Sequence, residues 1–198
     1  MDAKELSVFS DAWNTVHLPT DLTVTTVDAS VLRLLALFAA LTQAKAAVEV
    51  GAHDGTTGLA LFQGMADDGV LTSVEADPER LRVAKEAFSS SGISHGRTRL
   101  IPADPHEVLP RLTDGGYDLF LSSGKPSDHA AFAEQASRLL RPGGIAIFLD
   151  VADATDPSKR EPSQLSVRQF TEHMQAEEKW LTALLPLADG ILVAVLQA

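Results

Sequence analysis

Apolar runs that end in a glycine or an acid, each followed by a helical pattern, recur along this chain and constrain its fold most strongly. The first run, at 47–50, breaks into Gly51, Asp54 and Gly55 before helical sequence resumes at Thr57. A short apolar run bounded by glycine predicts a buried strand, a tight turn and a helix. Strands that alternate with helices predict an α/β domain, Rossmann-like and doubly wound, around a mostly parallel sheet.

The same pattern predicts the remaining elements. We expect further strands at 71–75, 98–104, 117–123 and 145–150, and helices at 4–16, 31–44, 57–66, 78–90, 105–112, 128–140 and 163–177. The run "RPGG" at 141–144 predicts a helix stop and a turn, and the charged, proline-containing stretch at 153–162 predicts a surface loop. Two strands joined by Asp189-Gly190 are expected in the tail, which completes a seven-stranded sheet with a C-terminal antiparallel hairpin.

Length and charge limit the organisation of the chain and its partners. Its 198 residues are enough for one domain, in which 1–45 would form an N-terminal helical segment and 46–198 a cofactor-binding core. A net charge of −11, from 27 acids against 16 bases, argues against nucleic-acid partners and anionic membranes. The absence of cysteine favours a reducing cytoplasm, and the longest apolar stretch, at 31–41, is too short to cross a bilayer.

The turn after the first strand is the expected ligand site, because open parallel sheets bind ligands beyond the carboxyl ends of their strands. Gly51 and Gly55 allow a close backbone approach. The N–H groups that open the following helix favour an anionic group. Since His53 stands where a G-x-G-x-x-G pattern has its middle glycine, a nucleotide-dependent oxidoreductase is disfavoured.

Acids at the ends of the next two strands extend this site. Glu75 could accept both hydroxyls of a ribose, and Asp77 is better placed to cap the helix that follows. Asp104 could meet an adenine amino group or simply cap the short helix after it, and both readings stay open. A glycine turn and two acids at three strand ends, without a phosphate-binding lysine, suit a nucleoside joined to an amino acid.

From about residue 22 onward the chain resembles the small bacterial class I O-methyltransferases related to the catechol and caffeoyl-CoA enzymes. The matching runs are "AVEVGAHDGTTGLAL", "LTSVEADPERLRVAKEAF", "LIPADPHEVLPRL", "YDLFLSS", "RLLRPGGIAIF" and "LLPLADGILVA". The resemblance implies S-adenosylmethionine as the cofactor and a homodimer, as in many members. It places Gly51 and Thr57 at the methionine part, Glu75 at the ribose, and Ala103 with Asp104 near the adenine. The expected cofactor site also includes Glu49, His53, Gly55, Ala76 and Ser122.

The chain departs from this family where members bind a divalent cation that holds the acceptor hydroxyl. Their fourth strand ends in a pattern like I-D-A-D-K, where this chain has Ser123, Lys125 and Pro126 in place of the two acids and the lysine. The Asp-Asn pair that ends their fifth strand reads Leu149-Asp150. Leucine cannot bind a hard cation, and a one-residue shift points Asp150 to the opposite face of a regular strand. We therefore expect no metal centre, unless a bulge returns Lys125 or Asp150 to the site.

Four residues near strand ends are candidates for a general base: Lys125, Asp150, His53 and His129. Each also has a plainer reading. Lys125 suits a solvated loop, Asp150 a cap after the fifth strand, His129 an exposed first helical turn, and His53 the lining of the cofactor turn. Taken with these residues, the resemblance implies a cytoplasmic, S-adenosylmethionine-dependent O-methyltransferase that acts on a small-molecule hydroxyl without a metal, with Lys125 and Asp150 as its catalytic residues. The alternative is a non-catalytic member of the fold that binds the cofactor or a partner.

Overall fold

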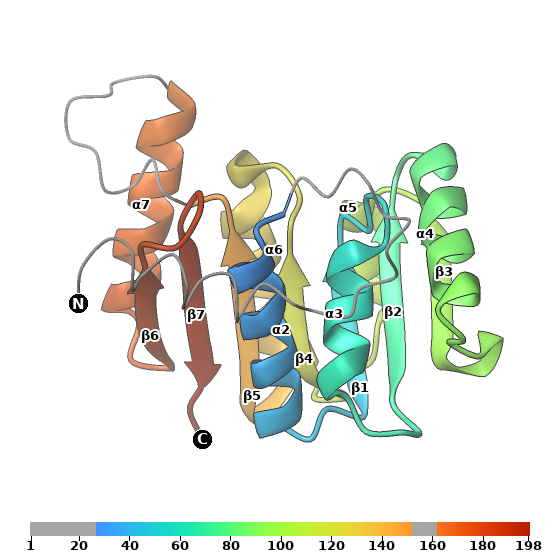
Figure 1. Cartoon of the computed structure of the whole chain (residues 1–198). Coiled ribbons are helices and arrows are strands. Elements are labelled where there is room, and N and C mark those ends of the chain that lie inside the picture. Colours follow the sequence, from blue (N-terminus) through green and yellow to red (C-terminus); the bar gives the residue numbers. More distant parts are fainter. Residues whose placement is uncertain (1–26, 152–161) are drawn as a thin grey trace, which may run out of the picture.

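A single mixed sheet organises the structure, a computed structural model that describes residues 27–151 and 162–198. The seven strands lie in the order β3-β2-β1-β4-β5-β7-β6 (Figure 1). Pairing is parallel from β3 to β5, whereas β7 is antiparallel to both β5 and β6. The predicted doubly wound sheet with its final hairpin is confirmed. The strands are β1 (Ala46–Val50), β2 (Val70–Glu75), β3 (Thr98–Pro102), β4 (Tyr117–Ser122), β5 (Leu140–Leu149), β6 (Trp180–Leu185) and β7 (Ile191–Leu196).

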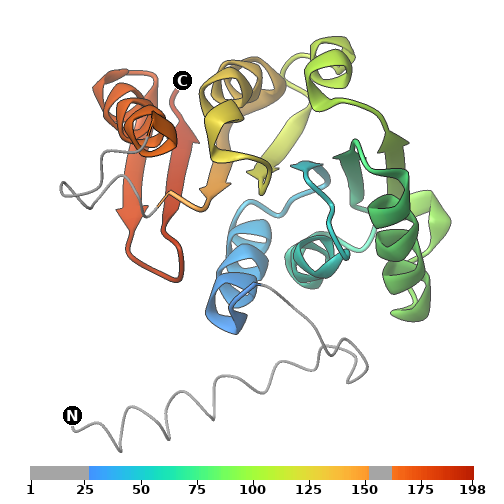
Figure 2. The same ribbon diagram turned by 90° about the horizontal axis from the view of Figure 1, so that it is seen from above.

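Helices cover both faces of the sheet. Seen from above, α2, α3 and α4 lie on one face, and α5, α6 and α7 lie on the other (Figure 2). Among the residues that the structure describes, no helix is long and apolar enough to span a membrane. The helices are α2 (Ala29–Leu41), α3 (Thr56–Gly64), α4 (Pro78–Ser90), α5 (Pro105–Val108), α6 (His129–Leu139) and α7 (Pro162–Ala176).

Aspartate caps begin three of the helices. Asp28 accepts the N–H of Ser30, Asp77 that of Glu79, and Asp104 that of His106, at 2.7 to 2.9 Å. Such caps satisfy N–H groups that have no partner within the helix, and each typically contributes about 1 kcal/mol. Two of these caps, Asp28 and Asp104, also line the cavity described below, so the same residues begin helices and form the site.

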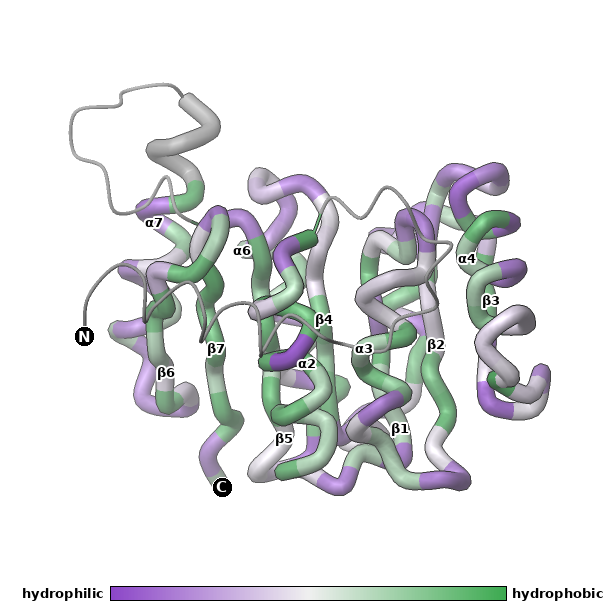
Figure 3. The backbone as a smooth tube through the Cα atoms, viewed as in Figure 1, coloured by the Kyte–Doolittle hydropathy of each residue, from purple (hydrophilic) through white to green (hydrophobic). Residues whose placement is uncertain are grey.

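The core consists of two apolar clusters, one on each face of the sheet. Leu71, Leu119 and Ile147 pack with α2, α3 and α4 on one side. Phe120 and Phe148 pack with α6 and α7 on the other side. Because both faces are covered, the central strands are mainly apolar, as parallel strands usually are, and Glu49 and Ser73 are buried polar exceptions. Figure 3 shows this as apolar colour along the strands, with hydrophilic colour on the outer helices and in the loops.

The structure differs from the sequence-based expectation at the "RPGG" run. α6 stops at Leu139 as expected, but β5 already begins at Leu140 and runs through the supposed turn. Tyr117 pairs with Leu140 and Leu119 with Ile145, so the extra residues form an irregularity in the β4–β5 ladder. Pairing with β4 on both sides of the two glycines keeps them inside the strand.

Two further expectations need comment. The helix expected at 105–112 is α5 followed by a 3₁₀ turn at Leu109–Arg111. The helix expected at 4–16 and the loop expected at 153–162, except for Pro162 at the start of α7, lie outside the described residues. The division of the chain into a segment 1–45 and a core 46–198 stays a prediction.

Close packing of α2 against α3 leads to a first prediction, at Gly64. A Cβ atom there would lie 1.9 Å from the carbonyl oxygen of Ala36 and 2.8 Å from the nitrogen of Ala40. We expect Gly64→Ala to lower the free energy of unfolding by about 1–3 kcal/mol, although alanine is the better helix former. Urea titration would measure this. The control is Gly96→Ala, whose nearest neighbour would be the Ser94 Oγ at 3.8 Å. An unchanged unfolding midpoint for Gly64→Ala would contradict the packing.

Candidate functional site

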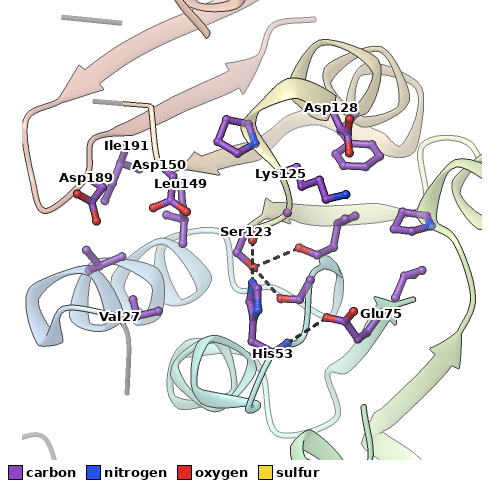
Figure 4. Close-up of a pocket in the computed structure, with 18 of the residues that line it drawn as sticks. Val27, His53, Glu75, Ser123, Lys125, Asp128, Leu149, Asp150, Asp189 and Ile191 are labelled. Carbon is purple, nitrogen blue, oxygen red and sulfur yellow. Dashed lines mark hydrogen bonds between the residues drawn. The ribbon is translucent and has the colours of Figure 1, made fainter. Parts of the chain in front are cut away.

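A cavity of about 800 Å³ lies at the carboxyl ends of the parallel strands. It sits where the strand order reverses between β1 and β4, which is the usual ligand site in such sheets. In Figure 4, Glu75 lies at one end of the cavity and Asp150 with Asp189 at the other, with His53 and Ser123 between them. The cavity therefore has two ends of different composition, joined by the loops after β1 and β4.

Of the twelve site residues predicted from the sequence, seven line this cavity and five do not. The seven lining residues are Gly51, His53, Glu75, Ala76, Asp104, Lys125 and Asp150. The five that lie outside the lining are Glu49, Gly55, Thr57, Ala103 and Ser122. These seven residues come from five separate stretches of chain, so the sheet topology brings them together.

The turn after β1 approaches the loop after β4 very closely. Gly51 has a φ of +85°, and a Cβ atom there would lie 3.2 Å from backbone atoms of Ser123 and Gly124. Only glycine fits without strain at such a position. Gly55 also has a positive φ, but a Cβ atom there would lie 3.0 Å from the Cα of Ala84 in α4. The structure thus assigns Gly51 to the cavity and Gly55 to helix packing.

Glu49 supports the turn from behind. Its carboxylate is fully buried and accepts the hydroxyl protons of Thr57 at 2.5 Å and Ser73 at 2.7 Å. Burial raises the pKa of Glu49, while the two hydroxyl donors lower it in part. The three side chains join β1, β2 and the start of α3. Glu49 and Thr57 therefore hold the shape of the ligand turn but do not line the cavity, contrary to the sequence-based expectation.

Glu75 is buried at the end of β2 and lines the cavity. One carboxylate oxygen accepts the N–H of Asp77 at 3.0 Å and the other accepts the N–H of His53 at 3.4 Å. A carboxylate has about four acceptor positions, so two N–H donors leave capacity for two hydroxyls. This agrees with the predicted contact to a ribose. Asp77 caps α4, as expected, which leaves Glu75 available.

His53 connects the two ends of the cavity. It has a backbone φ of +46°, which is unusual for a residue other than glycine. Its Nε2–H donates to the carbonyl oxygen of Ser123 at 2.8 Å (Figure 4), so its proton-free nitrogen is Nδ1. Nδ1 lies 3.5 Å from a guanidinium nitrogen of Arg80. His53 is thus a bridging residue between the turn after β1 and the loop after β4.

The end of β3 supplies an aromatic wall that sequence reasoning missed. His106, in α5, stacks on Phe132 of α6 with ring centroids 4.9 Å apart, and both rings line the cavity. Asp104 caps α5 and also lines the cavity, so the two readings left open for it are compatible. Ala103 lies outside the lining, in the turn after β3, where its N–H donates to the carbonyl of Ile101. The position of His106 directly after Asp104-Pro105, at a strand end, was the available signal.

Ser122 and His129 lie behind the cavity and not in it. Both are fully buried, and the Ser122 hydroxyl lies 3.1 Å from the Nδ1 of His129. The Nε2 of His129 lies 2.8 Å from the carbonyl oxygen of Leu149. Burial lowers the pKa of His129. The reading of His129 as an exposed residue is therefore wrong, and so is its candidacy as a base, because both ring nitrogens are engaged away from the cavity.

Asp150 does reach the cavity, although a regular strand would point it away. Its φ of +61° is left-handed, and this local break in the strand returns the side chain to the cavity. Partial burial, helped by the neighbouring Asp189, raises the pKa of Asp150, while His53 lowers it. Lys125 lines the cavity from the loop after β4. The two predicted catalytic residues thus share one cavity.

The residues at the family's metal positions do not fit a hard cation, which needs several oxygen ligands. The Ser123 hydroxyl lies 2.7 Å from the carbonyl oxygen of Gly51 and 3.2 Å from that of Val50, so its proton points at backbone. Lys125 is a cation and Leu149 is apolar. Within 27–151 and 162–198, no group of three or more histidines and acids is arranged to hold a metal.

Comparisons with known proteins agree with this geometry. A family model described as O-methyltransferase matches residues 7–196. A Mycobacterium marinum protein named as an O-methyltransferase is 42% identical over 178 residues, which cover 88% of this chain and 80% of that protein. A crystal structure from Corynebacterium glutamicum matches with a TM-score of 0.83 and 26% identity, over 100% of this chain and 91% of the other. The O-methyltransferase TomG of Streptomyces achromogenes, solved with S-adenosylmethionine, has a TM-score of 0.80 and 22% identity, over 100% and 92%.

The buried carboxyl of Glu49 leads to a prediction on stability and pH. Its pKa is raised in the folded state above the ordinary 4.5, so the folded chain binds this proton more tightly than the unfolded chain. Stability from this group is present at low pH and is lost as pH rises through the raised pKa. Glu49→Gln cannot titrate. We therefore expect the difference in free energy of unfolding, Glu49→Gln minus the natural chain, to increase as the pH rises above 4.5, because only the natural chain loses this stability. The difference should level off once the pH exceeds the raised pKa.

Denaturant titrations from about pH 5 to about pH 8 would measure this difference. Ser73→Ala is the matched control, because it removes a hydroxyl that lowers the pKa of Glu49. We expect it to extend the pH dependence to higher pH. A difference between Glu49→Gln and the natural chain that does not change with pH would show that Glu49 has no raised pKa.

Proposed function

The chain belongs to the O-methyltransferase family, and we propose that it transfers the methyl group of S-adenosylmethionine to a hydroxyl of a small molecule without a metal ion. The observation that carries this proposal is the two-ended cavity at the switch point of the sheet. One end has the groups that a nucleoside needs. The other end has the carboxylates of Asp150 and Asp189, and a break in the strand brings Asp150 into the cavity.

The cofactor end would be formed by Gly51, Glu75 and Asp104, with His106 and Phe132 as an aromatic wall. Glu75 has acceptor capacity for the ribose hydroxyls, and the wall suits a flat adenine ring. Gly51 lines the cavity at the turn, where the methionine part would lie. When bound, S-adenosylmethionine would supply an electrophilic methyl group on its sulfur. The complex of TomG with this compound supports the choice of cofactor.

The acceptor end is apolar with charged groups at its edge. Five apolar residues line it, from the start of α2 and just before it, the end of β5, and the β6–β7 connection with the first residue of β7: Val27, Val31, Leu149, Leu187 and Ile191. Such a lining suits a small acceptor with an apolar body, because buried apolar area provides affinity and a few polar groups provide orientation. The identity of the acceptor depends on side chains that differ widely between proteins of one fold.

Asp150 is proposed as the general base that accepts the proton of the acceptor hydroxyl. A base works best with a pKa near the working pH, and partial burial with Asp189 moves the pKa of Asp150 in that direction. Lys125 lines the same cavity, and its ammonium group would stabilise negative charge on the acceptor oxygen. In this proposal these two side chains do the work that a cation would otherwise do.

The remaining expectations concern partners and location. A homodimer, a cytoplasmic location, and the exclusion of nucleic acid and membranes stay predictions. The exposed apolar side chains of Leu37 and Leu41 on α2, at 53% and 68% exposure, and of Leu181 on the edge strand β6, at 61%, are compatible with a partner surface. The acidic balance of the chain supports the exclusion of polyanions.

Cofactor binding gives the first test of the function. We expect S-adenosylmethionine to bind with micromolar affinity, about −8 kcal/mol. Glu75→Ala should weaken this by about 1–3 kcal/mol, through the loss of hydrogen bonds to the ribose. Calorimetric titration with and without Mg²⁺ would measure both. Glu134→Ala, on the exposed face of α6, is the matched control and should bind like the natural chain. Equal binding by the Glu75 variant would refute its role.

Methyl transfer itself tests Asp150 and the absence of a metal. Formation of S-adenosylhomocysteine would be followed with a panel of small phenols and alcohols. We expect Asp150→Asn to lower kcat by about 10²–10⁴-fold, the usual contribution of a general base. A general base is inactive once it is protonated. Because the pKa of Asp150 is raised, activity should be lost on acidification at a higher pH than an ordinary aspartate would give.

Two controls complete this activity assay. Asp67→Asn, on the exposed connection between α3 and β2, should leave kcat unchanged. EDTA should leave the activity of the natural chain unchanged as well, and a loss restored by Mg²⁺ would overturn the metal-free mechanism. Cofactor binding without transfer to any acceptor would favour the alternative, a non-catalytic protein of this fold.

A further inference from the structure

His129 is a buried histidine without a role in the proposed chemistry, yet its ring is fully hydrogen-bonded. The carbonyl oxygen of Leu149 can only accept a proton, so the Nε2 of His129, 2.8 Å away, carries the hydrogen. Nδ1 then has a lone pair, which accepts the hydroxyl proton of Ser122 at 3.1 Å. The neutral ring satisfies both neighbours. Replacing a bonded group in so buried a place is costly.

The two bonds of His129 join the ends of two neighbouring strands. The β4–β5 ladder ends with the pair Ser122 and Phe148, so no β4 residue pairs with Leu149. The imidazole takes that place and connects Ser122 to Leu149 across the end of the sheet. The cavity residues Ser123 and Asp150 follow immediately after these two strand residues. The bonds of His129 therefore lie one residue behind the cavity on both strands.

The aromatic neighbours hold the ring in one orientation. His129 lies 5.4 Å from the ring of Phe148 in β5 and 5.6 Å from that of Phe170 in α7, between ring centroids. The two phenylalanine rings are themselves 5.0 Å apart. Close-packed rings have little rotational freedom. The Nε2–H bond thus has a fixed direction, which makes it suitable for setting the position of the Leu149 peptide group.

The backbone at Asp150 needs such support. Its φ of +61° is unfavourable for a residue with a Cβ atom, and such residues persist where the surroundings determine them. The N–H of Val151 donates to the carbonyl of Gly190 at 3.2 Å, on the side of β7. The carbonyl of Leu149 is held by His129, on the side of β4. Asp150 is therefore held between two anchored peptide groups, one on each side.

We propose that His129 is a positioning residue for methyl transfer, which holds Asp150 in the cavity through the carbonyl of Leu149. The proposal rests on the proposed function, in which Asp150 is the base. His129 touches neither cofactor nor acceptor in this arrangement, because it does not line the cavity. Its bond to Ser122 is secondary, because Ser122 pairs with strands on both sides, whereas Leu149 pairs with β7 only.

Three substitutions separate the two bonds. In His129→Gln the side-chain amide reaches the place of Nε2 and can still donate to Leu149. In His129→Asn the shorter amide reaches the place of Nδ1 and serves Ser122 only. His129→Phe keeps the packing against Phe148 and Phe170 and loses both bonds. The Gln and Asn variants are matched in chemistry and similar in size, so a general loss of stability would affect both.

We expect the Gln variant to keep kcat within about threefold of the natural chain, and the Asn and Phe variants to lose about tenfold to a hundredfold, as a misplaced catalytic group does. The KM for S-adenosylmethionine should stay within about twofold in all three, because Glu75 lies at the other end of the cavity. Thermal unfolding would be recorded beside the kinetics. Equal kcat in the Gln and Asn variants, or losses that follow only the melting temperature, would overturn the proposal.

A second measurement does not depend on activity. Backbone amide signals of Asp150 and Val151, recorded by nitrogen-15 NMR, should move in the Asn and Phe variants and stay close to the natural position in the Gln variant. Unmoved signals in the Phe variant would overturn the positioning of Asp150. An inactive natural chain would overturn the proposed function instead, and the amide signals would still decide whether His129 positions Asp150.

Discussion

The site depends on one close contact between two stretches of backbone, the turn after β1 and the loop after β4. Ser123 donates its N–H to Val50 and its hydroxyl proton to Gly51, and His53 donates back to the carbonyl of Ser123. Gly51 permits this approach because a Cβ atom would be only 3.2 Å from the opposite backbone. The contact joins the end of the cavity with Glu75 to the end with Asp150. His53, which makes this contact, also donates its backbone N–H to Glu75 at one end of the cavity.

The same contact accounts for a serine where the resemblance to metal-binding members leads us to expect an aspartate. The single hydroxyl proton of Ser123 points at two backbone carbonyl oxygens, that of Gly51 at 2.7 Å and that of Val50 at 3.2 Å. A carboxylate has no proton to donate and would be repelled by these oxygens, so it would have to turn into the cavity. Serine instead strengthens the loop contact and leaves the cavity without that charge. The substitution is thus coherent with its neighbours, and Lys125 next to it makes a cation still less favourable.

The architecture was predictable from the sequence because it depends on patterns that are local. Apolar runs, glycine turns and the Asp77-Pro78 cap each report on a few neighbouring residues, and right-handed crossovers then leave little choice of topology. The cofactor motif was predicted as a block, but its members divide by direction. Glu49 and Thr57 face each other behind the turn, and Gly55 faces α4. A motif gives the spacing of residues and does not say which of them face the ligand.

The acceptor end could not be predicted in this way, because its key features are not periodic. Asp150 reaches the cavity through a single left-handed residue, which the two-residue period of a strand cannot predict. His129 is the first residue of α6 and was expected to be exposed, yet tertiary packing buries it between the ends of β4 and β5. Both depend on contacts that are distant in sequence: His129 bonds to Leu149, 20 positions later, and the backbone after Asp150 bonds to Gly190. In this fold the turns near Glu75 follow largely from local sequence, whereas the arrangement around Asp150 follows from how the ends of β4 and β5 are held together.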